Sequence, residues 1–338
     1  MTSRIAFVGE AWGEHEERLR MPFVGPAGYL LNKLLDEAEI RRADCLLTNV
    51  FNLKPGPKND IETLCVPKSQ DTSRLPPLRA GKYLHSSHLP ELARLRSELL
   101  EYQPTCIVAL GGTASWALLH DSRISRIRGT TSAAISPPGL KVLPTYHPAA
   151  VLRQWDLRPV TLLDFLKAKR EAEFPEVRRP SRIIWTDPTL QDLETFFHDY
   201  LVSASHIAFD IETAGREITC IGFAPRTDLA LVIPFVDHRR GGNYWQSHSD
   251  ESQAWRIVRR ILDLPVPKVT QNGLYDVRFL WESYGIPVRN WAEDTMLLHH
   301  SLWIESEKGL GFLGSVYTNE PSWKLMRSKE AHTIKQED

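Results

Sequence analysis

Short apolar segments that alternate with helical patterns constrain the fold of this 338-residue chain more than any other feature. Each segment is too short for a helix and rich enough in Ile, Val and Leu for a buried strand. Leu30, Leu31, Leu34 and Leu35 mark one helical face between the first two segments, and Gly111 opens a helix after the third. The segments of the first half are 4–9, 45–50, 105–110 and 141–146. This alternation predicts βαβ units and an α/β fold with a parallel sheet.

A change in composition along the chain predicts two domains. Residues 173–181 combine Pro, Glu and Arg without periodicity, which is typical of a linker. A helix near 190–202 is expected beyond it, followed by three strands in quick succession and then a helix, a strand and a helix. These later segments are 206–212, 218–224, 228–235, 253–262, 268–271 and 274–284. We therefore predict domains at 1–172 and 182–338, both of mixed α/β character.

One segment of the first domain, residues 53–87, lacks a regular pattern and is rich in Pro, Lys and Ser. It interrupts the alternation of strands and helices after the second strand. Loops of this length are uncommon in compact domains unless they serve a function.

Charge and cysteine content limit the classes of function. The formal net charge is −1, so no overall cationic field indicates a nucleic-acid ligand, and any basic surface must be local. The basic residues considered for phosphate contacts are Arg123, Arg126, Arg128, Lys167, Lys169 and Arg170. The four cysteines lack Cys-x-x-Cys spacing, which predicts reduced thiols and a cytoplasmic protein. Neither a signal peptide nor an apolar run of about 20 residues is found, so we expect no secretion and no membrane insertion.

A pair of carboxylates interrupts an apolar strand predicted in the second domain. Asp210 and Glu212 are two residues apart, so both side chains lie on one face of the strand. Phe209 and Ile211 then point to the other face. Two like charges at this spacing are costly, and a divalent cation such as Mg²⁺ or Mn²⁺ is the usual compensation. A solvent-facing pair without a metal is the alternative for this motif alone.

A third carboxylate follows near the end of a later strand. Asp276 lies one turn into a predicted helix, where it could converge on the same ions, and Asn272 could cap that helix. Asp-Ile-Glu-Thr at 210–213 and Asn-x-x-x-Asp at 272–276 resemble the first two exonuclease motifs of family A DNA polymerases. The segments 293–297 and 308–313 are also similar to that family, and the resemblance covers roughly residues 182–323.

The resemblance implies a ribonuclease H-like (DnaQ-type) domain that hydrolyses DNA from the 3′ end with two divalent cations. Asp210, Glu212 and Asp276 would then be catalytic residues and metal ligands. Asn272 and Asp294 would belong to the substrate-binding region, with Asp294 as a supporting residue or helix cap.

A third motif of that family, Tyr-x-x-x-Asp or His-x-x-x-Asp, has no match after Asp294. Tyr317 is followed four residues later by Pro321, and His332 by Gln336. We expect the domain to be truncated before this motif, and nuclease turnover to be weak or absent. Three explanations stay open: a fragment of a longer polymerase, completion of the site by a partner chain, or loss of activity.

Polar residues also follow three of the strands predicted in the first domain. A Gly-rich turn containing Glu10 follows the first strand, Asn49 ends the second, and His147 follows the fourth. The carboxyl ends of parallel strands meet at one edge of the sheet, where open α/β sheets bind their ligands. With Phe23 at the same edge, these groups predict a pocket. A simple tight turn and a structural histidine are the alternatives.

These segments read Gly-Glu-Ala-x-Gly, Pro-Phe-Val-Gly, Thr-Asn-Val and His-Pro-Ala, and over residues 5–170 they resemble family 4 of the uracil-DNA glycosylase superfamily. The resemblance implies a three-layer α/β/α domain that acts on DNA with a flipped-out base. Phe23 would stack on uracil, and Asn49 would bind its Watson–Crick edge. His147 would stabilise the uracil anion, while Glu10 would help to place water. The remaining substrate-binding positions would be Gly9, Ala11 and Gly13.

The first domain departs from family 4 at two places. Trp12 stands where the family has proline, and Leu53 occupies the position of a cysteine that binds an iron–sulfur cluster. Cys65 alone remains of the ligand set. One thiolate cannot hold a cluster that needs four, so we expect no cluster.

Together the resemblances indicate a DNA replication or repair protein similar to the N-terminal region of certain bacteriophage DNA polymerases. Its expected partners are single-stranded DNA or DNA with a flipped-out base, and a polymerase domain or subunit. A DNA-binding or replisome-tethering module with inactive sites is the alternative. A nucleotide-utilising α/β enzyme is disfavoured, because neither G-x-G-x-x-G nor a P-loop is found.

Overall fold

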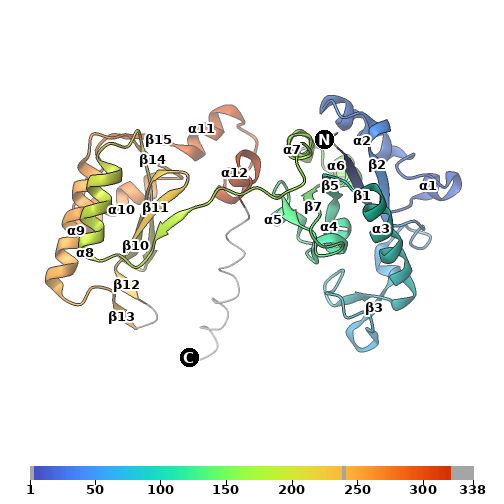
Figure 1. Cartoon of the computed structure of the whole chain (residues 1–338), viewed down its shortest axis with the longest axis horizontal. Coiled ribbons are helices and arrows are strands. Elements are labelled where there is room, and N and C mark those ends of the chain that lie inside the picture. Colours follow the sequence, from blue (N-terminus) through green and yellow to red (C-terminus); the bar gives the residue numbers. More distant parts are fainter. Residues whose placement is uncertain (1–3, 238–240, 321–338) are drawn as a thin grey trace. The chain divides into compact units, whose positions relative to one another are not determined.

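The computed structural model describes residues 4–237 and 241–320 and consists of two compact units (Figure 1). The first unit comprises Met1–Arg179 and Gly311–Asp338, and the second comprises Pro180–Leu310. The chain leaves the first unit at the predicted linker and rejoins it at Gly311. The prediction of a second domain over 182–338 therefore differs from the structure at its C-terminal end. None of the helices within the described ranges could span a membrane.

A mainly parallel sheet forms the centre of the first unit. Its strands are ordered β2 (Leu46–Phe51), β1 (Ile5–Ala11), β5 (Cys106–Leu110), β7 (Lys141–Thr145) and β6 (Ser132–Ala133). The first four are parallel, and β6 pairs with β7 in the antiparallel direction. All four parallel strands lie within one or two residues of the predicted segments. Their shared direction brings the residues that follow β1, β2 and β7 to one edge.

Helices cover both faces of this sheet, because alternate strand residues point to opposite sides. Ala6 and Val8 of β1 share an apolar cluster with residues of α3 (Leu89–Tyr102) and α4 (Gly111–Leu119). Ile5 and Phe7 share another with residues of α2 (Pro26–Glu37), α6 (Pro148–Arg153) and α7 (Leu157–Glu171). The predicted three-layer α/β/α arrangement is confirmed.

The segment 53–87 has more structure than the sequence indicates. β3 (Cys65–Pro67) and β4 (Lys82–Leu84) form an antiparallel pair within it. Ile61, Leu64, Leu78 and Leu84 bury their side chains in the cluster that contains α3 and α4. The segment is therefore anchored to the domain by its own apolar residues. The shorter helices of this unit are α1 (Glu14–Leu19), α5 (Ile124–Ile127) and α12 (Leu310–Tyr317).

The second unit contains a six-stranded sheet in the order β15-β14-β9-β10-β11-β8. β9 (Ile207–Ala214), β10 (Glu217–Arg226) and β11 (Leu229–Pro234) form an antiparallel meander. β14 (Lys268–Thr270) and β15 (Trp291–Asp294) extend it in parallel beside β9, and β8 (Ile183–Trp185) adds an edge beside β11. A meander continued by parallel strands from its first member is the ribonuclease H-like order, as predicted.

Helices α8 (Leu190–Phe196) and α9 (His248–Asp263) share one apolar cluster with Phe209 and Ile211 of β9. The predicted alternation along β9 is confirmed, because Phe209 and Ile211 are buried while Asp210 is exposed and Glu212 is half-buried. α10 (Leu274–Tyr284) follows β14, and α11 (Thr295–Leu302) follows β15.

Candidate functional site

Three of the four predicted pocket residues, Phe23, Asn49 and His147, line a cavity at the carboxyl edge of the sheet, whereas Glu10 is not among its lining residues. A Cβ atom added to Gly9 would lie 2.2 Å from Oδ1 of Asn49 and 2.6 Å from Cζ of Phe23, so only glycine fits beneath these side chains. This cavity has a volume of about 390 Å³. Its lining includes Ala11, Gly13, Phe23, Asn49 and His147. The structure thus brings together the aromatic ring, the amide and the imidazole that the sequence predicts.

Phe23 is held in an unusual backbone conformation. Its φ of 55° lies in the left-handed region, which a bulky residue rarely adopts. Glu16 fixes the adjacent backbone, because its Oε1 accepts hydrogen bonds from the N–H groups of Val24 (3.0 Å) and Gly25 (2.8 Å). Arg42 donates to the Phe23 carbonyl at 3.3 Å. Neither residue was predicted from the sequence, although a glutamate three residues after Gly13 is a capping-box signal.

Asn49 is 2% exposed and is held through its backbone. Arg94 of α3 donates to the carbonyls of Asn49 (2.7 Å) and Val50 (3.1 Å). Glu91 and Glu98 flank the guanidinium at 3.0 and 2.7 Å and hold it in place. The contact of Arg94 with the backbone of Asn49 was also not predicted, because nothing in the sequence pattern of α3 indicates which strand the helix faces.

His147 is the N-cap of α6, and its Nδ1 accepts a hydrogen bond from the N–H of Ala149 at 3.1 Å. An Nδ1 that accepts leaves the proton of a neutral imidazole on Nε2, which is then a donor. Burial lowers the pKa of His147, and the charge of Glu10 only partly opposes this effect. The ring lies 6.1 Å from that of Phe23 in a stacked arrangement. His147 is therefore a neutral hydrogen-bond donor at the cavity.

Glu10 is held by two residues from other elements. Thr113, at the start of α4, donates its hydroxyl to Oε2 of Glu10. Arg79, from the segment 53–87, donates to the same oxygen at 3.3 Å. Arg79 has no counterpart among the predicted site residues.

Trp12, which replaces the proline of family 4, is 7% exposed and packs into the fold. Its backbone N–H donates to the carbonyl of Leu53 at 3.1 Å, and the guanidinium of Arg20 lies 5.6 Å from its ring. The substitution is therefore accommodated by burial of the indole rather than by exposure at the cavity mouth.

The cysteines of the first unit do not fit an iron–sulfur cluster. Cys106 is fully buried in β5, and burial raises the pKa of its thiol to about 12. Cys45 and Cys65 donate to the backbone carbonyls of Arg41 and Ile61 respectively. Burial also raises the pKa of both thiols. The first unit holds these three cysteines, and no three His, Cys, Asp or Glu side chains among the described residues are grouped closely enough to hold a metal, whereas a cluster needs four thiolates.

The carboxylates of the second unit lie near one another around β9. Oδ1 of Asp276 accepts a hydrogen bond at 3.1 Å from the N–H of Ile211, the residue between Asp210 and Glu212. Burial raises the pKa of Asp276 to about 6, and the charges of Asp210 and Asp294 act in the same direction. No three His, Cys, Asp or Glu side chains in the described ranges are grouped closely enough to hold a metal ion. Metal binding by Asp210, Glu212 and Asp276 therefore stays a prediction.

Asp294 has the supporting role that was expected. It caps α11 by accepting from the N–H groups of Met296 and Leu297, and it also accepts from those of Asn272 and Gly273. Asn272 is not a helix cap, the structural alternative considered for it, because Gly273 takes the N-cap position of α10. Asn272 instead adopts a left-handed conformation with φ of 59°.

Neither position considered for a third exonuclease motif lies in the described part of the second unit. Tyr317 lies in α12, which is part of the first unit. His332 lies outside the described residues.

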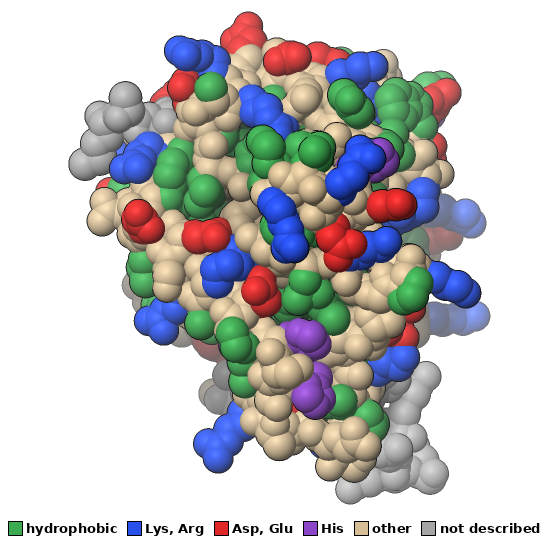
Figure 2. Space-filling model, turned by 90° about the vertical axis from the view of Figure 1, so that its right-hand side faces the viewer, with side chains coloured by type: hydrophobic (Ala, Val, Ile, Leu, Met, Phe, Trp, Pro, Cys, Tyr) green, Lys and Arg blue, Asp and Glu red, His purple; other side chains and the backbone are tan. Residues whose placement is uncertain are grey.

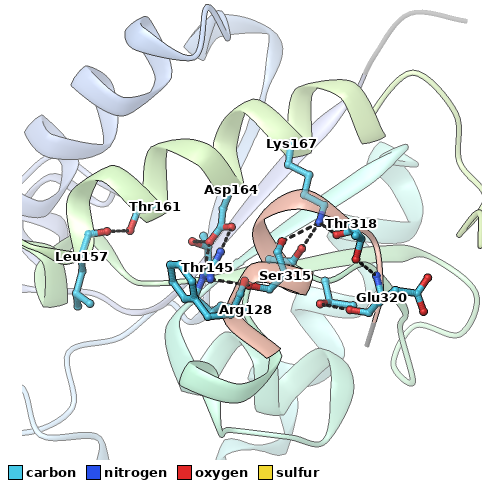
Figure 3. A network of polar contacts seen from close by, with 12 residues as sticks. Arg128, Thr145, Leu157, Thr161, Asp164, Lys167, Ser315, Thr318 and Glu320 are labelled. Carbon is cyan, nitrogen blue, oxygen red and sulfur yellow. Dashed lines mark hydrogen bonds and ion pairs between the residues drawn. The ribbon is translucent and has the colours of Figure 1, made fainter. Parts of the chain in front are cut away.

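Several basic residues considered for phosphate contacts have structural partners instead. Arg128 and Lys167 are buried: Arg128 pairs with Asp164, and Lys167 donates to the carbonyls of Ser315 and Thr318 (Figure 3). The exposed Arg123 pairs with Asp121 at 2.6 Å. Figure 2 shows acidic and basic side chains interspersed over one face of the molecule. Arg128 and Lys167 therefore do not make the phosphate contacts that were considered for them, because Arg128 pairs with the buried Asp164 and Lys167 donates to backbone carbonyls.

Solved structures of exonuclease domains are similar to this chain, but only at low sequence identity and low TM-score. The EXD2 exonuclease domain soaked in Mg and dGMP is 17% identical, with a TM-score of 0.27 and coverage of 44% of this chain and 74% of that one. The RNase D–GMP complex of Trypanosoma brucei is 14% identical, with a TM-score of 0.34 and coverage of 45% and 46%. The fold of the second unit is assigned from its own strand order.

Comparison of sequences is informative for the first unit. The type-4 uracil-DNA glycosylase of Thermotoga maritima is 37% identical over 173 residues, which cover 50% of this chain and 78% of that protein. The type-4 enzyme of Archaeoglobus fulgidus is 33% identical over 171 residues, with coverage of 49% and 75%. These matches support the expectation of a hydrolase that acts on DNA. The model of the uracil DNA glycosylase superfamily matches residues 1–173, and the chain therefore belongs to that superfamily.

Proposed function

We propose that the first unit excises uracil from DNA by hydrolysing the N-glycosidic bond. The observation that carries this proposal is the convergence of Phe23, Asn49 and His147 on one cavity. An aromatic ring can stack on a planar base, while an amide offers both a donor and an acceptor to its edge. The similarity to type-4 uracil-DNA glycosylases supports uracil as the base.

The reaction breaks the bond between N1 of uracil and C1′ of the sugar. The bonding electron pair leaves with the base, the oxygen of a water molecule bonds to C1′, and a proton of that water passes to Glu10. The neutral His147 donates its Nε2–H to the negative charge that develops on a uracil oxygen. Such donors are most effective when they are fixed before the reaction begins, and the Ala149 N–H fixes this ring.

We also propose that the second unit is a metal-dependent 3′-5′ exonuclease of the proofreading type. Asp210, Glu212 and Asp276 supply hard oxygen donors, which suit Mg²⁺ or Mn²⁺. When bound, such cations would lower the pKa of water and stabilise the leaving 3′ oxygen. The position of Asp276 supports the proposal, since its Oδ1 accepts a hydrogen bond from the N–H of Ile211, which lies between Asp210 and Glu212.

The two activities together suit the N-terminal region of a bacteriophage DNA polymerase in the cytoplasm of its host. A polymerase domain or subunit would be the partner, and DNA the shared substrate. In that setting, excision of uracil and removal of terminal nucleotides would both act on strands that the polymerase handles.

The direct test of the first activity is uracil release by the full chain from single-stranded and duplex oligonucleotides. We expect release by the unaltered chain and a loss of about 10²- to 10³-fold in Asn49→Ala, since a fixed hydrogen-bonding group is removed. The melting temperature of the variant should be compared with that of the unaltered chain. No release by the unaltered chain would overturn the proposal and favour a DNA-binding module.

A further inference from the structure

Buried side chains and hydrogen bonds anchor the segment 53–87 to the rest of the first unit. Leu78 and Leu84 are fully buried, and β3 pairs with β4. The indole N–H of Trp116 on α4 donates to the carbonyl of Pro76 at 2.9 Å. These contacts fix the segment against α4, whose first residues lie at the carboxyl edge of the sheet.

A tight turn in this segment determines where Arg79 lies. The N–H of Lys82 donates to the carbonyl of Arg79 at 2.9 Å, and the N–H of Arg79 donates back at 3.3 Å. Gly81 occupies the left-handed region of this turn with φ of 70°. Because Leu78 is buried on one side and β4 begins on the other, the backbone of Arg79 has little freedom.

The side chain of Arg79 ends at the carboxyl edge of the sheet. Its Nη2 lies 3.3 Å from Oε2 of Glu10 and 3.5 Å from the hydroxyl of Thr113. A Cβ atom added to Gly112 would lie 3.7 Å from Nη1, so the guanidinium also lies against the start of α4. Glu10 is thus held on one oxygen by two donors from different elements.

We propose that Arg79 is a positioning residue for uracil excision and that the segment 53–87 serves to deliver it to Glu10. This inference rests on the proposed glycosylase function. With Oε2 occupied by Arg79 and Thr113, the carboxylate has a single orientation, and Oε1 is the oxygen that accepts from the attacking water. Misplacement of a reacting group by about 1 Å can cost about 100-fold in rate. The role of Arg79 is therefore exerted through Glu10 rather than through the DNA.

The test is a double-mutant cycle on single-turnover uracil release. Arg79→Ala should lower the rate constant about 10- to 100-fold and leave the dissociation constant for uracil-containing DNA unchanged. In the Glu10→Gln background the same substitution should cause no further loss, because its effect passes through Glu10. Added guanidinium ion should restore part of the rate of Arg79→Ala. Lys82→Ala, on the same turn, is the matched control and should keep the full rate.

The outcomes separate the alternatives. Additive losses in the cycle, or an unchanged rate in Arg79→Ala, would overturn the inference while leaving the proposed function intact. Weaker DNA binding with a reduced salt dependence would make Arg79 a phosphate contact and would also overturn it. An equal loss in Lys82→Ala would show that the variants merely disturb the turn. No uracil release by the unaltered chain would remove the proposed function and this inference together.

Discussion

In the first unit, Phe23, Asn49 and His147 each have their backbone or ring fixed by hydrogen bonds from neighbouring elements. In the second unit, Asp210, Glu212 and Asp276 lie around one strand, and the pKa of Asp276 is raised to about 6. The substrate proposed for the first site is a neutral base, which uncharged donors and acceptors can bind. The second site contains like charges, which the proposed cations would compensate. The proposed need for a cation thus follows from the chemistry proposed for each site.

Removal of metal should separate the two units most sharply. Any digestion of single-stranded DNA by the chain, which we expect to be weak because the third exonuclease motif has no match, should be abolished by chelation with EDTA. Uracil release should stay unchanged, because cations are proposed for the carboxylate site alone. Both activities are measured on the same preparation, and Mn²⁺ is then added back to restore digestion. Asp210→Ala should prevent this restoration. Loss of uracil release upon chelation would contradict the comparison.

The second largest effect is expected in the buried polar network that connects β7, α7 and α12 of the first unit. Asp164 pairs with the buried Arg128 and accepts from Thr145, two residues before His147, while Arg128 donates to Ser315 of α12 (Figure 3). Asp164→Ala leaves a buried guanidinium unpaired and should cost about 3–5 kcal/mol of stability. Urea unfolding combined with hydrogen exchange in β7 and α12 assigns the loss to the first unit.

The control for that change is Lys169→Ala on the same helix. Lys169 forms an exposed pair with Glu39, and its loss should cost less than about 1 kcal/mol. Equal effects of the two substitutions would show that the buried Asp164–Arg128 pair contributes no more stability than the exposed Lys169–Glu39 pair.

Features of the fold and the sites that depend on local sequence patterns could be predicted, whereas those that depend on contacts between distant residues could not. Strand periodicity placed Asp210 and Glu212 on one face, and the shared direction of parallel strands placed Asn49 and His147 at one edge. The return of residues 311–320 to the first unit could not be predicted, because the buried Arg128 and Lys167 that receive them look like surface bases in the sequence. Arg79 was missed for the same reason. Its pairing with Glu10 spans 69 residues and depends on a turn in an irregular segment.

Loss of the imidazole should have the third largest effect. His147→Ala removes a fixed donor to the uracil anion and should lower the single-turnover rate of uracil release about 10²- to 10³-fold. Metal-dependent digestion by the second unit should not change. His85 is exposed and does not line the cavity, and His85→Ala is the control expected to keep the rate. A loss of less than about threefold in His147→Ala would break the assignment of the donor.

Glu16 offers a finer test of how the first site is held. Glu16→Gln keeps one acceptor oxygen but loses the charge that strengthens three backbone hydrogen bonds around Phe23. We expect a loss of about 1–2 kcal/mol in the binding of uracil-containing DNA, since bonds to a charged group are stronger than neutral ones. The adjacent, exposed Glu17 serves as control through Glu17→Gln. Unchanged binding in Glu16→Gln would mean that Arg42 alone suffices to hold Phe23.

The smallest effect concerns pH. Burial lowers the pKa of His147 below its ordinary value of 6.5, so the neutral donor is favoured in the folded chain. Because the folded chain binds this proton less tightly than the unfolded chain does, His147 costs no stability above pH 6.5. The fold loses stability as the pH falls through the lowered pKa. Uracil release should follow the same neutral form and decline by about twofold or less between pH 7.5 and 6.5. Single-turnover rates of uracil release from pH 5.5 to 8 measure this decline, which should be absent in His147→Ala. A decline centred above pH 6.5 would mean that the pKa of the imidazole is raised rather than lowered. A rate that rises as the pH falls would mean that the imidazole is charged when it acts, and the first site would then also depend on a compensating charge.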